Sequence, residues 1–195
     1  MTILYTKNKQ KKKLIYTCYF PQTKLAKDLL EKTDLSQIVA IKHGIKNEPA
    51  AALALENILK CKLGRCGLFV HKKYPFLASS PDRLLRNYLS EDHLVEIKCP
   101  YSIRNGDITS KLEYLKEQNG ELCLDNAHYY YFQVQGQLAC SGMNSCIFVI
   151  YTYKDLKYFM IQRDETFIDS MIENLISFYE KYFKPALLNK YLYRI

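Results

Sequence analysis

The stretch "ASSPDRLLRNYLSEDHLVEIKCPYS", residues 78–102, constrains the fold most strongly, because it places charged side chains inside an apolar run. Successive side chains of a β-strand point to opposite faces. If residues 93–100 form a strand, Glu96 and Lys98 share one face, while Val95 and Ile97 share the other. An isolated Glu-x-Lys pair is most often a solvated ion pair, so other residues must decide whether this one marks a site.

Asp82 is the residue that favours a site. It follows Pro81 within a candidate strand, residues 76–86, and "NYLSED" is a hairpin-like turn that would bring this strand beside residues 93–100. Asp82 would then lie next to Glu96, and two close carboxylates repel each other unless a cation lies between them. Mg²⁺ binds a few carboxylates and keeps waters that a phosphate can displace. The sequence therefore predicts a magnesium site at Asp82 and Glu96, with Lys98 beside it.

Such a site can hydrolyse a phosphodiester, because a metal ion binds the phosphate and lowers the pKa of an attacking water. Lys98 would orient this water and offset developing negative charge. The chain has 28 Lys and Arg against 20 Asp and Glu, a formal net charge of +8, which attracts a polyanion. Part of this excess lies in the lysine-rich residues 7–13, and such a terminus is more often simply solvated.

Length and composition predict one globular domain, since 195 residues with 48% hydrophobic content can bury a core. We expect residues 1–20 to be a basic, loosely ordered tail and residues 21–195 to be a single domain. The sequence contains no run of about 18 apolar residues, so we expect neither a membrane span nor a membrane partner.

The seven cysteines are odd in number and scattered, which is typical of reduced thiols in an intracellular protein, in the cytoplasm or the nucleus. Cys61, Cys66 and His71 form one C-x4-C-x4-H run without a fourth ligand or the usual paired spacing. We interpret these cysteines as small buried apolar residues instead of a zinc site.

The remaining patterns predict an α/β arrangement, in which helices flank a mostly antiparallel central sheet. Gly44 is expected to end one helix, and Asn47 to cap the next, with Pro49 in its first turn. A turn is expected at Asn119-Gly120. The expected helices are residues 24–32, 35–43, 47–60, a short one at 111–116, one from 127, and a last one at 164–183 that stops before Pro185; the expected strands are 66–72, 76–86, 93–100, 145–153 and 156–163.

Two polar side chains fall on helix faces that should be buried. Glu48 shares a face with Ala52 and Leu55, although an acid favoured by the dipole of a helix N-terminus is the more common explanation. Gln133 lies on the apolar side of its helix, where an unpaired amide would cost about 1–3 kcal/mol, so it needs a partner in the core. Gln135 and Gln137 are expected at the surface.

The spacing of Pro81-Asp82 and Glu96-x-Lys98, fourteen residues apart, resembles the PD-(D/E)XK nuclease superfamily. More specifically, the chain resembles the lambda-type exonucleases, also called YqaJ-like viral recombinase domains, over about residues 35–184. Five blocks in the order and approximate spacing of that family carry the resemblance: "HGIKNEPAAALALE", "SSPDRLL", "VEIKCPYS", "YYYFQVQGQL" and "IQRDETF".

The resemblance implies a restriction-endonuclease-like core, with a central, mixed but mostly antiparallel sheet flanked by helices. It implies that Asp82, Glu96 and the Ile97 carbonyl bind a metal, and that Lys98 activates or positions the water. It makes Glu48 an acid that supports the metal site. Gln133 would orient the catalytic groups from the facing helix, with Tyr130 alongside it.

The implied function is a Mg²⁺-dependent deoxyribonuclease, with Mn²⁺ as a substitute metal, that degrades linear duplex DNA from 5′ to 3′ for recombination. A ring-shaped homotrimer and a single-strand annealing protein are the implied partners beside DNA. An endonuclease with the same metal site, and an inactive DNA-binding relic of a viral or mobile element, stay open as alternatives.

The chain departs from the family in two places. Residues 1–34 show no counterpart of the helix whose serine and arginine engage the DNA end in active relatives, and Arg83 stands where glycine usually follows the proline-aspartate pair. We expect a tolerated replacement. A positive φ at this position would strain Arg83 by roughly 1 kcal/mol, and a phosphate contact by Arg83 is a further alternative.

Overall fold

The computed structural model describes residues 22–31, 34–109 and 111–192. They fall into two compact units: one runs from Leu35 to Arg163, and the other combines the segment up to Asp34 with the segment from Asp164 onward. The expected tail, residues 1–20, lies outside the described residues, and the expectation of a single domain over residues 21–195 stays a prediction.

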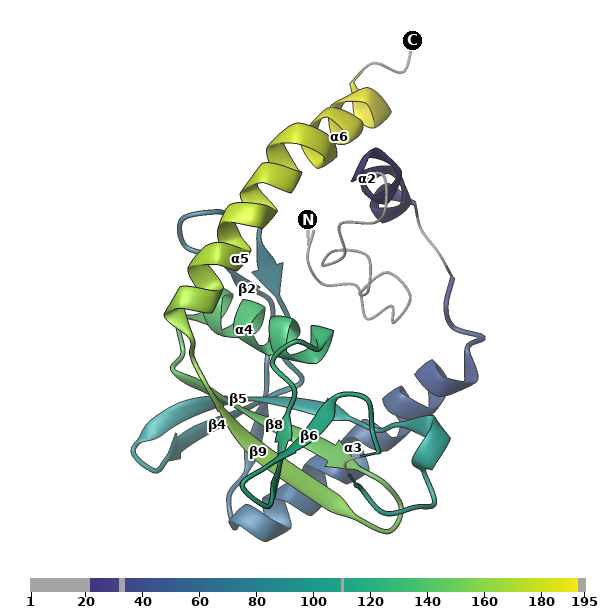
Figure 1. The fold of residues 1–195 in the computed structure, drawn as a ribbon, viewed down its shortest axis with the longest axis vertical. Helices are drawn as coiled ribbons and strands as arrows, with labels where there is room; N and C mark the ends of the chain where they lie inside the picture. Colours follow the sequence, from purple (N-terminus) through teal and green to yellow (C-terminus); the bar gives the residue numbers. More distant parts are fainter. Residues whose placement is uncertain (1–21, 32–33, 110, 193–195) are drawn as a thin grey trace. The chain divides into compact units, whose positions relative to one another are not determined.

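The first unit is built on a five-stranded sheet in the order β1-β4-β5-β8-β9. Figure 1 labels β4, β5, β8 and β9 of this sheet. Neighbouring strands are antiparallel except β5 and β8, which are parallel, so the predicted mixed but mostly antiparallel sheet is confirmed. The strands of this sheet are β1 (Leu63–Arg65), β4 (Arg83–Tyr88), β5 (Glu91–Lys98), β8 (Ser145–Tyr151) and β9 (Leu156–Gln162).

The predicted hairpin after Asp82 is present as β4 and β5. Arg83 pairs with Val95, and Tyr88 pairs with Glu91 across a two-residue turn. Both turn residues, Leu89 and Ser90, have positive φ, which is the backbone of the turn that matches the twist of a hairpin. This pairing brings the residue before Arg83 alongside the centre of β5.

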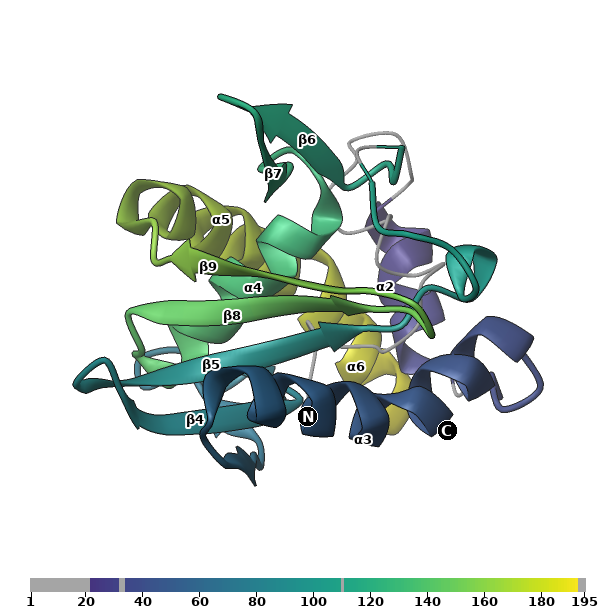
Figure 2. The same ribbon diagram turned by 90° about the horizontal axis from the view of Figure 1, so that it is seen from below.

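One face of the sheet packs against α3 (Val39–Leu59), and Figure 2 shows this helix crossing β4 and β5. Val95 and Ile97 of β5 join Ala52 and Leu55 of α3 in one buried cluster with residues of β8. The opposite face, which carries Glu96 and Lys98, is covered by α4 (Tyr129–Ser141). The predicted alternation along β5 is therefore confirmed, and it separates an apolar layer from a polar one.

The predicted helix break near Gly44 is wrong, because α3 runs through it without interruption. Asn47 is buried within the helix instead of capping it, and its Nδ2 donates a hydrogen bond to the His43 carbonyl at 2.8 Å. Pro49 removes one main-chain donor from the helix. Burial of the same helix against the sheet outweighs these local signals, because tertiary packing supplies most helical stability.

The connection after β5 differs from the prediction. The short helix expected at residues 111–116 is wrong, since β6 (Leu115–Gln118) and β7 (Glu121–Leu124) form a separate hairpin. Its turn is the predicted Asn119-Gly120, where both residues have positive φ. The polar composition hid the strands, and only the turn signal was strong.

The first unit also contains β2 (Phe69–Val70), β3 (Ala78–Ser79) and the 3₁₀ turn η1 (Tyr101–Ile103).

The second unit is helical and contains α2 (Gln22–Leu30), α5 (Glu165–Phe178), the π-helical turn η2 (Tyr179–Phe183) and α6 (Lys184–Tyr191). Asp164 caps α5 by accepting a hydrogen bond from the Phe167 N–H at 3.0 Å. The predicted end before Pro185 is wrong, because Pro185 lies in the first turn of α6, which follows η2 directly.

Among the helices of the described segments, none combines the length and the apolar character that crossing a membrane requires.

Burial on α3 gives a direct test of the apolar layer. Leu55 is fully buried in the cluster beneath β5, whereas Leu53 of the same helix is 54% exposed. We expect Leu55→Ala to lower the free energy of unfolding by about 2–5 kcal/mol, because it leaves a cavity. Leu53→Ala should change it by less than about 0.5 kcal/mol. Urea denaturation followed by circular dichroism measures both, and equal losses would contradict this packing.

Candidate active site

Glu96 is the centre of the polar layer, with only 1% of its surface exposed. Its Oε1 accepts hydrogen bonds from the Lys98 ammonium and the Gln133 amide. Its Oε2 accepts one from the Gln137 amide at 2.7 Å. A buried carboxylate is tolerated only when donors and an opposite charge surround it. Glu96 is thus held in place by residues from its own strand and from α4.

Lys98 is fixed from three sides. Beside its ion pair with Glu96, its Nζ donates to Gln133 Oε1 at 3.2 Å and lies 4.6 Å from the ring centroid of Tyr130. The ring face attracts a cation. The side chain of Lys98 remains 12% exposed. The structure therefore brings Lys98, Gln133 and Tyr130 together, as the resemblance implied.

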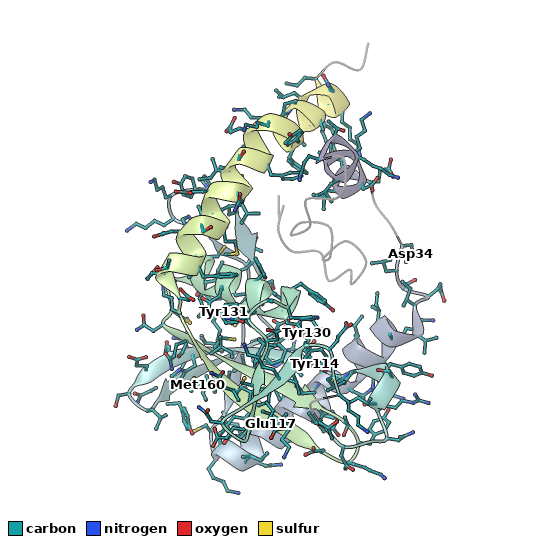
Figure 3. The ribbon with its side chains drawn as sticks, in the orientation of Figure 1. Asp34, Tyr114, Glu117, Tyr130, Tyr131 and Met160 are labelled. Carbon is teal, nitrogen blue, oxygen red and sulfur yellow. The ribbon has the colours of Figure 1, made fainter. Side chains whose placement is uncertain are left out.

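Tyr130 belongs to an aromatic cluster behind the lysine. Its ring meets Tyr114 edge to face at 5.0 Å, and the two lie side by side in Figure 3. Burial raises the pKa of the Tyr130 hydroxyl well above its usual value, so the ring stays neutral. The cluster thus gives Lys98 a rigid apolar wall.

Asp82 lies just before β4 and faces the same site. Its Oδ2 accepts a hydrogen bond from the Ile97 N–H at 2.8 Å, which ties the loop before β4 to β5. Burial, and next the negative charge of Glu96, raise the pKa of Asp82 from its ordinary 3.8 to about 7. The two carboxylates are therefore neighbours whose repulsion Lys98 offsets only in part.

Glu48 reaches the site through Arg83. The Arg83 Nη1 donates to Glu48 Oε1 at 2.6 Å and to the Asp82 carbonyl at 2.6 Å. Glu48 lies in the middle of α3, which excludes its interpretation as an acid at a helix N-terminus. Arg83 is the first residue of β4, and its φ is not positive. The backbone strain of roughly 1 kcal/mol that a positive φ would cause is therefore absent.

Two glutamines of α4 were placed wrongly from the sequence, because Gln135 and Gln137 are both fully buried. Gln135 Nε2 donates to the Gln162 carbonyl at 2.8 Å, toward β9. Gln137, one helical turn after Gln133, contacts Glu96 instead. The four-residue spacing in "QVQGQ" was the signal that could have identified it, since residues four apart share a helix face.

Gln137 presents its amide nitrogen to Glu96, while its buried Oε1 has no hydrogen-bond partner in the structure's described portion. An unpaired buried acceptor costs about 1–3 kcal/mol. The hydrogen bond from Gln137 Nε2 to Glu96 explains why an amide is buried here in spite of its unpaired Oε1. Gln137 is therefore a residue of the site, and it holds the second oxygen of Glu96.

The donor set fits a Mg²⁺ ion better than a closed metal cage. The described residues contain no group of three or more His, Cys, Asp or Glu arranged to hold a metal. Two adjacent carboxylates with lone pairs to spare, Asp82 and Glu96, are what Mg²⁺ needs, because it keeps waters and shares substrate phosphates. Burial, and next the charge of Glu96, raise the pKa of Asp82, so a cation between the two carboxylates would relieve their repulsion. The role of the Ile97 carbonyl stays a prediction.

The six described cysteines are unpaired thiols: Cys61, Cys66, Cys99, Cys123, Cys140 and Cys146.

The fold and these residues define a PD-(D/E)XK nuclease core: an acid before one strand, and an acid and a lysine on the polar face of the next. A comparison with protein families adds the particular group, since residues 4–144 match the model of the YqaJ-like viral recombinase domain. The match covers more than half of the sequence. The chain belongs to the family of YqaJ-like viral recombinase domains.

Comparisons with curated proteins and solved structures add further likenesses. A 119-residue segment is 30% identical to the uncharacterized protein R354 of Acanthamoeba polyphaga mimivirus, over 56% of this chain but only 19% of that protein. The alkaline exonuclease LHK-Exo from Laribacter hongkongensis has a similar fold, with a TM-score of 0.65 at 21% identity over 96% of this chain and 87% of its own. A structure of LHK-Exo in complex with dAMP gives a TM-score of 0.71 at 20% identity, over 92% and 89%.

A phage-related exonuclease from Haemophilus somnus 129PT has a TM-score of 0.62 at 14% identity, with 97% of this chain and 92% of its own covered. These likenesses confirm the expected exonuclease fold.

The raised pKa of Asp82 predicts a pH dependence of stability in the metal-free protein. Because the folded state holds this proton up to about pH 7 and the unfolded chain only to about 3.8, Asp82 stabilises the fold at low pH. That stability is lost as the pH rises through 7. Asp82→Asn should not lose stability in this way, because asparagine does not titrate. The free energy of unfolding of Asp82→Asn minus that of wild type should therefore rise by on the order of 1–4 kcal/mol between pH 4.5 and 8.

Chemical denaturation in EDTA at several pH values measures this difference. Asp92→Asn is the matched control, since Asp92 is a more exposed acid on β5 that pairs with Arg86. Parallel pH profiles for wild type and Asp82→Asn would show that Asp82 titrates normally.

Proposed function

We propose that this chain is a divalent-metal-dependent deoxyribonuclease that hydrolyses phosphodiester bonds, with Mg²⁺ as its metal and Mn²⁺ as a substitute. The observation that carries the proposal is the convergence of Asp82 and Glu96 beside a fixed Lys98. A polyanionic substrate agrees with the formal net charge of +8. Membership in a viral recombinase family and a fold shared with exonucleases support DNA as that polyanion.

The proposed roles follow from the contacts. Asp82, Glu96 and the Ile97 carbonyl would hold the metal. When bound, the metal would polarise the phosphate and lower the pKa of the attacking water. Lys98 Nζ, held in place by Glu96, Gln133 and Tyr130, would orient the attacking water and stabilise negative charge on the phosphate oxygens. Gln133 and Gln137 would keep Glu96 ionised and in place.

The direction and the substrate end are finer proposals. By family resemblance we propose a 5′-to-3′ exonuclease on linear duplex DNA that leaves single strands for recombination, in a homotrimer and with an annealing protein as partner. We place this activity in the cytoplasm or the nucleus.

The first test uses three substrates: linear duplex with a 5′-phosphate, linear duplex with a 5′-hydroxyl, and closed circular DNA, each with Mg²⁺ or with EDTA. Loss of linear DNA alone supports the exonuclease, and nicked circles support an endonuclease that uses the same acids. Binding that salt weakens, without a Mg²⁺-dependent product, would indicate a DNA-binding relic instead.

Lys98 provides the decisive variant in this assay. Lys98→Ala should lower the cleavage rate at least about 100-fold, because its charge acts at the reacting phosphate. Lys62→Ala is the control, since Lys62 is 88% exposed and pairs with Glu56 away from the site. Gel analysis of product against time measures both rates. Undiminished cleavage by Lys98→Ala would overturn the catalytic assignment.

The buried glutamines of α4 allow a matched test of positioning. Gln137→Met should lower the cleavage rate by about 10–100-fold, because Glu96 loses a donor that orients it. Gln135→Met also removes a buried amide, but one that bonds the Gln162 carbonyl. Its rate should match wild type once corrected for the folded fraction measured by circular dichroism. Equal losses in both variants would assign Gln137 a purely structural role.

A further inference from the structure

The guanidinium of Arg83 lies inside the acidic site instead of reaching into solvent. Its side chain is only 16% exposed, and that of Glu48 is 22% exposed. A single nitrogen, Nη1, bonds both the Glu48 carboxylate and the Asp82 carbonyl, each at 2.6 Å. Arg83 is thus fixed between α3 and the loop that carries Asp82.

The charges around the site limit the number of divalent ions that it can bind. Glu48, Asp82 and Glu96 provide three carboxylates, while Arg83 and Lys98 provide two fixed cations. Glu96 is paired with Lys98, and Glu48 is paired with Arg83. One divalent ion changes the formal charge of the cluster from −1 to +1. A second would bring it to +3 in a partly buried place, where like charges repel strongly.

A second ion would also need a carboxylate that Arg83 already holds. Charge-assisted hydrogen bonds of this length are among the stronger polar contacts in proteins. A chain with glycine at position 83 would have neither this bond nor the positive charge, and Glu48 would face the other acids without a cation.

We propose that the Arg83 guanidinium takes the place of a second metal ion beside Glu48, so that the site binds a single divalent cation at Asp82 and Glu96. This inference rests on the proposed metal-dependent nuclease. Arg83 then acts as a permanent cation near the reacting phosphate, and Glu48 positions Arg83 instead of binding metal. The site should differ in metal stoichiometry from one with glycine after the proline-aspartate pair.

Counting bound Mn²⁺ tests the inference without any cleavage assay. Equilibrium dialysis with Mn²⁺, with the bound ion counted by electron paramagnetic resonance, should give one ion per chain for the wild type. Arg83→Gln and Arg83→Gly should each bind two, or bind the second at least about tenfold more tightly than wild type. Arg86→Gln is the matched control, because Arg86 lies on the same strand, is 74% exposed and pairs with Asp92; it should bind one.

Variants of Glu48, alone and combined with Arg83→Gln, complete the test. Glu48→Gln alone should still bind one Mn²⁺, whereas Glu48→Gln combined with Arg83→Gln should lose the second ion that Arg83→Gln gained. If Arg83 were only a structural link between α3 and β4, its variants would melt at a lower temperature in circular dichroism and would still bind one ion. That result would overturn the inference.

The remaining outcomes separate this inference from the proposed function. Two ions bound to the wild type would overturn the single-cation site and leave the metal-dependent nuclease standing. Asp82→Asn should lose the one ion. A wild-type protein that binds no Mn²⁺ at all would overturn the proposed metal site and the role of Arg83 together.

Discussion

The buried carboxylate of Glu96 is the interaction on which the rest of the site depends. A charge with 1% exposure is stable only if donors reach it from several directions. Lys98 comes from the same strand, and Gln133 and Gln137 come from α4. The strand and the helix must therefore meet in one register, and the same contacts fix the position of Lys98.

One face of β5 stabilises the fold, and the other carries the residues of the site. Val95 and Ile97 pack against α3 in an apolar cluster, which holds the strand rigidly. Glu96 and Lys98 point to α4, where amides and Tyr130 surround them. Rigid backing on one face is what allows a charged pair to be positioned on the other, because the strand cannot shift without opening the core.

Local sequence signals succeeded where geometry is local and failed where packing decides. The hairpin of β4 and β5 and the turn at Asn119-Gly120 follow from short-range patterns, and both are present. Gly44 and Pro49 suggested two helices, but burial along the sheet makes one. Residues 111–116 have a polar composition that hides the start of a hairpin strand. Gln137 was expected at the surface and instead contacts Glu96. Its four-residue spacing from Gln133 indicates a shared helix face, but only the packing of α4 shows which carboxylate that face meets.

The sequence by itself determined the α/β class, the alternation that puts Glu96 and Lys98 on one face, and the nearness of Asp82, because these follow from strand periodicity and a short connection. Only the tertiary structure decided what lies across from them. Gln137 and Arg83 reach their partners over separations of 41 and 35 residues. Contacts at such separations depend on how helices pack on the sheet, and no local pattern encodes that packing.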